Sequence, residues 1–135
     1  MVYAVIDTNV IVSALLSRHS DSSTAIIRRF ILDGGIVPLY NEEIFQEYLD
    51  VLHRPKFHFP EDLIDDILDA ISQNGIMLGR TKTEEVFNDP KDIVFYEVAL
   101  SKDGSFLVTG NTKHFPASPI VVTPAELLGI LEVMS

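Results

Sequence analysis

The chain has 135 residues, of which 47% are hydrophobic and none is cysteine, and its formal net charge at pH 7 is −10. This composition predicts one globular domain with a substantial core, and it excludes a disordered chain, a disulfide framework and thiolate metal sites. The negative charge argues against a nucleic-acid partner unless positive charge is gathered locally or metal ions intervene.

No apolar run approaches the ~20 residues that a membrane helix needs. No basic segment precedes the apolar stretch at the N-terminus, as it would in a signal peptide. We therefore expect a cytoplasmic protein without a membrane segment.

The first 35 residues predict a strand followed by two helices. Residues 2–6 form a short, largely β-branched apolar run that is typical of a buried strand. Residues 9–16 are apolar enough to begin a buried helix, and 17–23 is a polar loop. A serine or threonine at 22–24 caps the second helix, and the glycine pair at 34–35 ends it.

The next segment predicts a strand and a helix, with one conflicting signal. Residues 36–40 have strand composition, but Pro38 indicates an edge or bulged strand because proline cannot donate a ladder hydrogen bond. Asn41 is a good helix cap, and apolar residues then recur at helical spacing until Pro55. We expect residues 55–59 to be a loop.

A long helix and a long connection follow. Pro60 opens the helix and Gly75 closes it, with a short strand predicted at 76–78. Residues 81–92 form the longest polar connection in the chain.

The last third of the sequence again alternates helix and strand. Residues 90–102 predict a largely buried helix, and 105–111 a strand that ends in a turn. A final strand and helix follow, with Thr123 and Glu126 spaced as a capping box. This alternation predicts a three-layer α/β/α fold with a mainly parallel central sheet, in a single domain over residues 1–135.

Polar side chains gather where the strands of such a sheet end. Asp7 follows the first strand directly, and Asn111 follows the stretch LVTG at 107–110. Glu47 lies in the helix after the second strand, and Asp92 in the first turn of a buried helix. Because ligands bind beyond the carboxyl ends of parallel strands, these side chains can converge. Clustered carboxylates need a cation, and oxygen ligands without cysteine favour Mg²⁺ or Mn²⁺ over zinc.

Each residue also has a plain structural interpretation. Asp7 can cap the helix that follows it, and Glu47 can face solvent. Asn111 can take a left-handed turn after a glycine. For Asp89 we favour helix capping over catalysis, whereas capping and a site role are compatible for Asp92.

Four stretches of the sequence together resemble the PIN-domain family. They are IDTNVIVSALL near the start, EYLDVLHRPKF at 47–57, DPKDIVFYEVAL at 89–100 and LVTGNTKHF at 107–115. The sequence is most similar to the branch of toxins of bacterial toxin–antitoxin pairs, related to VapC. The resemblance covers nearly the whole chain, in order.

This resemblance implies a metal-dependent ribonuclease and assigns roles to matching positions. Asp7, Glu47 and Asp92 fall on the three acidic catalytic and metal-binding positions, and the fourth acidic position is occupied by Asn111. The resemblance also implies that Asn9 and Thr109 hydrogen-bond acids or metal-bound water, and that Asp89 is an additional acid beside the site.

The amide at position 111 departs from the family pattern. It can offer an oxygen to a metal but brings no charge, so a second ion should bind more weakly. Single-metal catalysis therefore becomes more plausible, and so does a catalytically silent PIN scaffold. A third interpretation, a phosphatase with an aspartyl nucleophile, conflicts with Asn9, because that chemistry usually places a second acid there.

The implied reaction is hydrolysis of single-stranded RNA that leaves 5′-phosphate and 3′-hydroxyl ends. Arg54, Lys56 and Lys113 follow the candidate site residues in sequence, so we expect them to flank the path of the RNA phosphates. The resemblance also implies a small antitoxin protein as partner and a homodimer.

Overall fold

The computed structural model describes residues 1–134, which contain a five-stranded sheet in the order β3-β2-β1-β4-β5. All four neighbouring pairs are parallel, so the predicted α/β class is confirmed. Strand β1 lies in the centre, and the edge strands are only two residues long. The strands are β1 (Val2–Ile6), β2 (Ile36–Tyr40), β3 (Ile76–Met77), β4 (Phe106–Val108) and β5 (Val121–Val122).

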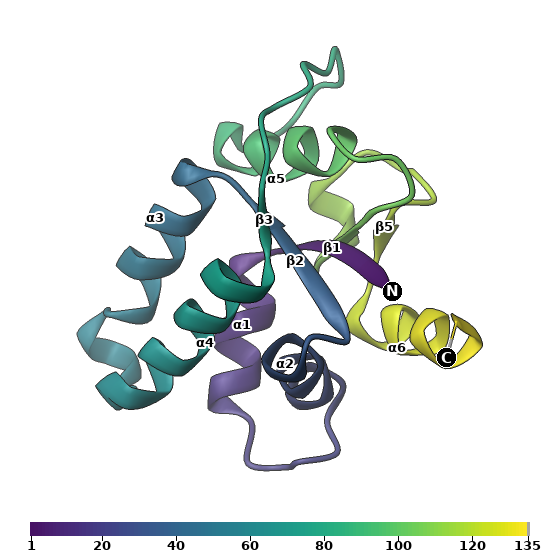
Figure 1. Cartoon of the computed structure of the whole chain (residues 1–135). Helices are drawn as coiled ribbons and strands as arrows, with labels where there is room; N and C mark the ends of the chain where they lie inside the picture. The colour runs from purple at the N-terminus through teal and green to yellow at the C-terminus, as the bar shows by residue number, and fades with distance from the viewer. Residues whose placement is uncertain (135) are drawn as a thin grey trace.

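Within the described residues, six α-helices and two short 3₁₀ turns join these strands. Figure 1 shows α5 on one side of the sheet and α1, α2 and α4 on the other, as the layered prediction requires. No helix within residues 1–134 combines the length and apolar character that a membrane span requires. The helices are α1 (Thr8–Leu16), α2 (Ser23–Asp33), α3 (Glu42–Leu52), α4 (Glu61–Asn74), α5 (Pro90–Leu100) and α6 (Pro124–Met134), and the 3₁₀ turns are η1 (Pro55–Phe57) and η2 (Thr112–His114).

Local sequence signals explain where these helices begin and end. Ser22 accepts a hydrogen bond from the N–H of the third residue of α2, and Gly34 ends that helix at a φ of +88°. Asn41 caps α3 in the same way, at 2.9 Å. Thr123 and Glu126 exchange the two hydrogen bonds of a capping box at the start of α6. We expected a loop at 55–59, but the first three of these residues form the 3₁₀ turn η1.

The prediction that Pro38 marks an edge or bulged strand is wrong. Pro38 pairs in register with Ala4, and β2 lies between β1 and β3. The carbonyl of Tyr40 faces the β3 side, where it accepts a hydrogen bond from Leu78. Because residues alternate along a strand, Pro38 faces that side too, and no hydrogen bond to β1 is lost. Gly75 lies opposite, where a side-chain Cβ would stand 2.4 Å from the Pro38 carbonyl.

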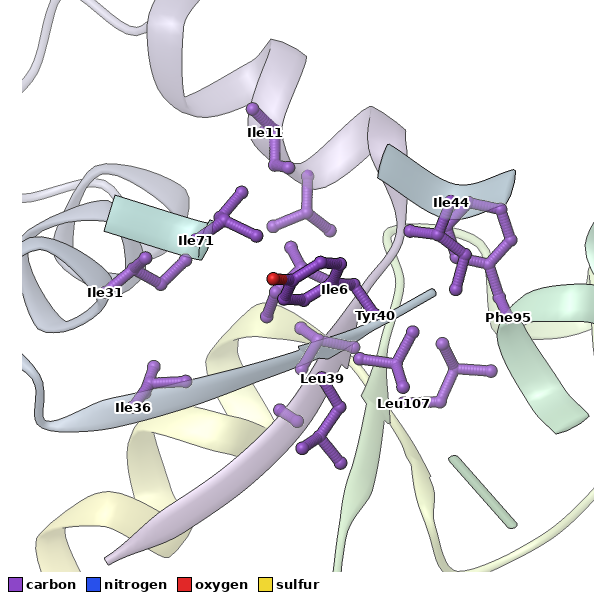
Figure 2. Packing of buried hydrophobic residues seen from close by; sticks show 14 of the residues in the cluster. Ile6, Ile11, Ile31, Ile36, Leu39, Tyr40, Ile44, Ile71, Phe95 and Leu107 are labelled. Atoms are coloured by element: carbon purple, nitrogen blue, oxygen red, sulfur yellow. The ribbon is translucent and has the colours of Figure 1, made fainter. Parts of the chain in front are cut away.

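The core joins the sheet to the helices that carry the candidate site. Figure 2 shows Ile6, Leu39 and Leu107 of the three central strands beside Ile44 of α3 and Phe95 of α5. Each of these side chains is buried, with at most 1% of its surface exposed. Close packing of this kind fixes α3 and α5 against the carboxyl ends of the strands.

Candidate active site

Asp7 lies at the carboxyl end of the central strand. Its backbone N–H continues the ladder by donating to the carbonyl of Val108, and the residue is only 9% exposed. Asp7 occupies the N-cap position of α1, but its side chain makes no capping hydrogen bond. It instead accepts a hydrogen bond from the Thr109 hydroxyl, 2.7 Å from Oδ2. The capping interpretation of Asp7 is therefore wrong.

The Asp7 carboxyl group lies in an environment that disfavours its negative charge. Its pKa is raised from 3.8 to about 6, mainly by burial, and the hydrogen bond from Thr109 partly opposes this shift. The charges of Asp92 and Glu47 contribute to the same rise in the pKa of Asp7. The three carboxylates are therefore close enough to repel one another, although they come from β1, α3 and α5.

Glu47 is half-buried on α3 and is held by its neighbours. It accepts a hydrogen bond from the hydroxyl of Thr8, the residue that follows Asp7. The next residue of α3, Tyr48, donates a hydrogen bond from its buried hydroxyl to the carbonyl of Ile6. These bonds tie α3 to the end of β1, so Glu47 is not the free solvent-facing residue of the plain interpretation.

Asp92 lies in the first turn of α5 and is also half-buried. Burial raises its pKa, as do the charges of Asp89 and Glu47, while the nearby imidazole of His114 opposes the shift. The His114 Nδ1 atom lies 3.9 Å from Asp92 Oδ2. Asp89 caps α5 by accepting a hydrogen bond from the Lys91 N–H at 2.9 Å, so the capping prediction is confirmed.

The remaining polar candidates lie around Thr109. Asn111 has a φ of −137°, so the left-handed turn is wrong. Its N–H donates to the Thr109 hydroxyl, and its side-chain nitrogen lies 3.0 Å from His114 Nε2. Asn9 is exposed and accepts a long hydrogen bond of 3.4 Å from the Gly110 N–H. Asn9 therefore contacts a backbone group there, whereas Thr109 contacts an acid.

A groove runs between α3 and the start of α5. It has a volume of about 560 Å³, and Glu47 and Arg54 line it with Lys91 of α5. The other two basic residues expected on the RNA path lie elsewhere. Lys56 packs over the Phe57 ring, 5.1 Å from its centre, and Lys113 lines a separate hollow formed by residues 112–121. Arg54 alone of the three shares a groove with a candidate site acid.

The carboxylates of Asp7, Glu47 and Asp92 are the kind of ligand that a hard divalent cation prefers, but their present spacing does not enclose an ion. Within residues 1–134, Asp7, Glu47 and Asp92 form no ion pair with lysine or arginine, so their charge is largely uncompensated. In the same part of the chain, no three acidic, histidine or cysteine side chains are grouped so that they could hold a metal ion as they stand. The three carboxylates therefore lie close enough to interact as charges, but they do not form a closed coordination shell.

The sequence interpretation missed three residues that contact this site. Thr8 had a detectable signal, since a hydroxyl directly after Asp7 lies at the start of the same helix. His114 had a weaker signal, three residues after Asn111 in a tight turn. Tyr48 occupies an inward helical position and offered no sign that its hydroxyl reaches β1.

Comparison with known proteins identifies the family. The family model described as PIN domain matches residues 3–113, a span that includes Asp7, Glu47, Asp92 and Asn111. No curated protein and no solved structure matches the chain. The match covers well over half of the chain and agrees with the parallel sheet and its helices. The chain therefore belongs to the PIN-domain family, whose members are generally nucleases that typically use divalent metal ions.

Proposed function

We propose that this chain is a Mg²⁺- or Mn²⁺-dependent endoribonuclease that hydrolyses phosphodiester bonds of single-stranded RNA. The observation that supports this most strongly is the mutual repulsion of Asp7, Glu47 and Asp92. The pKa of Asp7 is raised to about 6, mainly by burial and in part by the other two charges. A protein that buries repelling carboxylates at the carboxyl edge of a parallel sheet gains a site for a cation.

Each residue has a definite part in the proposed site. Asp7, Glu47 and Asp92 would hold the ion, with Asn111 as a further, uncharged oxygen donor. Thr109 orients Asp7, and hydrogen bonding to Thr8 orients Glu47. When bound, the ion supplies the Lewis acidity for attack of water on the phosphodiester. Cleavage of the bond to the 3′-oxygen leaves 5′-phosphate and 3′-hydroxyl ends without a side-chain nucleophile.

The proposed site is tested by cleavage of a single-stranded RNA with Mn²⁺. We expect activity that EDTA removes, and at least a roughly tenfold loss in Asp92→Asn. The matched control is Asp66→Asn, which removes the same charge from an exposed position on α4. Equal activity of Asp92→Asn and the wild type would refute this assignment.

We propose Arg54 as a contact for the RNA backbone, because it lines the groove that contains Glu47. Lys56 and Lys113 lie outside that groove and serve as comparisons. Arg54→Glu should weaken RNA binding more than Lys56→Glu, with both variants equally folded. Equal effects of the two exchanges would argue against this path.

A second candidate function is a catalytically silent PIN scaffold. Two observations favour it: the acids do not form a closed metal-binding group within residues 1–134, and Asn111 replaces an acid of the family pattern. Stabilisation by Mn²⁺ without RNA cleavage would support the scaffold. Hydrolysis of a small phosphomonoester with RNA left intact would instead indicate the phosphatase alternative.

We further propose that the chain is the toxin of a toxin–antitoxin pair and forms a homodimer. The toxin proposal rests on the similarity to the VapC-like branch, and the dimer proposal on the resemblance to PIN-domain proteins. A toxin should arrest growth on expression, and co-expression of the small protein encoded by an adjacent gene should relieve the arrest. Light scattering on the purified chain measures the dimer directly.

A further inference from the structure

Arg80 links the two helices that carry Glu47 and Asp92. It lies in the connection between β3 and α5. Its Nη1 donates to both carboxylate oxygens of Glu43 on α3, at 2.9 and 3.1 Å. Its Nε and Nη2 reach Oε1 of Glu97 on α5, at 2.8 and 2.7 Å. One guanidinium group thus bridges α3 and α5.

The α5 end of this bridge is firmly anchored. The Glu97 side chain is only 8% exposed, and its second oxygen accepts a hydrogen bond from the Thr83 N–H at 2.8 Å. The N–H of Thr81 donates to the Glu97 backbone carbonyl. The hydrogen bond from Thr83 and the pairing with Arg80 lower the pKa of Glu97. Glu97 therefore remains ionised and holds Arg80 against α5.

The α3 end of the bridge lies next to the proposed site. Glu43 and Glu47 are four residues apart on α3 and so share one face of the helix. Both line the groove between α3 and α5, as does Arg80. Among the ion pairs found within residues 1–134, those of Arg80 join α3 to α5.

The bridge opposes a repulsion between the same two helices. Glu47 on α3 and Asp92 on α5 interact as like charges. Without a cation between them, this repulsion favours a wider groove. A guanidinium group with its fixed fork of donors holds two carboxylates at a defined separation, which a single ammonium group does less well.

We propose that Arg80 is a positioning residue that sets the separation of α3 and α5, and thereby the affinity of the Asp7, Glu47 and Asp92 site for a divalent cation. The proposal rests on the proposed metal-dependent function. Arg80 touches neither the ion nor the substrate in this scheme. It acts through the spacing of Glu47 and Asp92.

The proposal predicts that loss of Arg80 changes the affinity for the cation in the direction opposite to the one that simple electrostatics predicts. Removing a positive charge near the acids should by itself strengthen cation binding. Loss of the bridge should weaken it, because the carboxylates are then less well placed. Arg80→Gln tests both effects, and Lys82→Gln is its matched control. Lys82 lies in the same connection and carries the same charge. Among the described residues it forms a salt bridge only with the exposed Glu84, and its charge acts on Glu97 without forming a salt bridge to it.

The first measurement is calorimetric titration with Mn²⁺, without RNA, at a temperature where circular dichroism shows all variants folded. We expect Arg80→Gln to raise the dissociation constant about tenfold or more, and Lys82→Gln to leave it equal or lower. Arg80→Lys keeps the charge and is the milder variant, for which we expect a smaller increase. Equal or tighter Mn²⁺ binding by Arg80→Gln would overturn the positioning role.

The second measurement reports the spacing without any metal. The chain has no cysteine, so Gln46→Cys on α3 and Lys91→Cys on α5 allow specific spin labelling. We expect a longer or broader distance distribution when Arg80→Gln is added to this pair. An unchanged distribution would overturn the bridge alone. A wild-type chain that binds no Mn²⁺ would overturn the proposed function instead.

Discussion

Replacing Asp7 with asparagine should stabilise the protein in the absence of metal. The side chain keeps its shape, and its amide oxygen can still accept the hydrogen bond from Thr109. What is lost is a buried negative charge that also repels Glu47 and Asp92. The substitution therefore removes an unfavourable interaction from the folded state.

The size and pH dependence of this effect follow from the pKa of Asp7. Folding raises that pKa from 3.8 to about 6. At ~1.4 kcal/mol per unit, ionised Asp7 costs the folded state about 3 kcal/mol above pH 6–7. Since the folded state holds its proton more tightly than the unfolded chain, stability falls as the pH rises between these two values. The cost shrinks to about 1 kcal/mol near pH 4.5.

Thermal unfolding in EDTA between pH 4.5 and pH 8 measures this difference. For a chain of 135 residues, Asp7→Asn should raise the melting temperature by about 10 °C at pH 8, and by much less at pH 4.5. Asp66→Asn is the matched control, because it removes the same charge from an exposed position on α4. A gap that is absent at pH 8, or that does not shrink toward pH 4.5, would refute the reasoning.

Three further substitutions test the contacts around the site and the sheet. Thr109→Val removes the hydrogen bond that lowers the pKa of Asp7, so it should cost about 1–3 kcal/mol at pH 8 and less at pH 4.5, measured by urea unfolding. Tyr48→Phe should cost about 1 kcal/mol in the same assay, because a buried carbonyl of β1 loses its donor. Gly75→Ala places a Cβ 2.3 Å from a backbone oxygen and should cost at least about 2 kcal/mol, whereas Gly79→Ala meets nothing within 4 Å and should be nearly neutral. Equal melting temperatures for the two alanine variants would contradict the close approach of residue 75 to the carbonyls of Ile71 and Pro38.

Local signals made most of the fold predictable from the sequence. Ser22, Asn41 and the pair Thr123 and Glu126 act through hydrogen bonds within a few residues, so their effect does not depend on the rest of the chain. Pro38 was misjudged because its tolerance depends on a distant segment, the close approach of residue 75. The prediction that the three acids lie near one another required only the rule that ligands gather at the carboxyl edge of a parallel sheet, and their role as metal ligands stays a prediction.

The parts of the site that the sequence did not reveal depend on long-range side-chain contacts. Glu97 lies in a helix that reads as apolar, and its partner Arg80 is 17 residues away. The bond from Thr8 to Glu47 spans 39 residues, and its effect follows from how α3 lies against β1. Lys56 was predicted on the RNA path from its nearness in sequence to Glu47. It lies in η1 and is not among the residues that line the groove of Glu47 and Arg54, and its contact with RNA stays a prediction.

The central place of β1 has a consequence for synthesis on the ribosome. Thr109, which holds Asp7, lies 102 residues further along the chain, and β4 must pair with β1 before that contact exists. Until then, one edge of β1 has unpaired backbone N–H and C=O groups that can pair with any other extended chain. A nascent polypeptide that stalls before residue 106 would therefore be prone to aggregate and would lack the hydroxyl that orients Asp7. The contact between Thr109 and Asp7 would thus form only after nearly the whole fold has been translated.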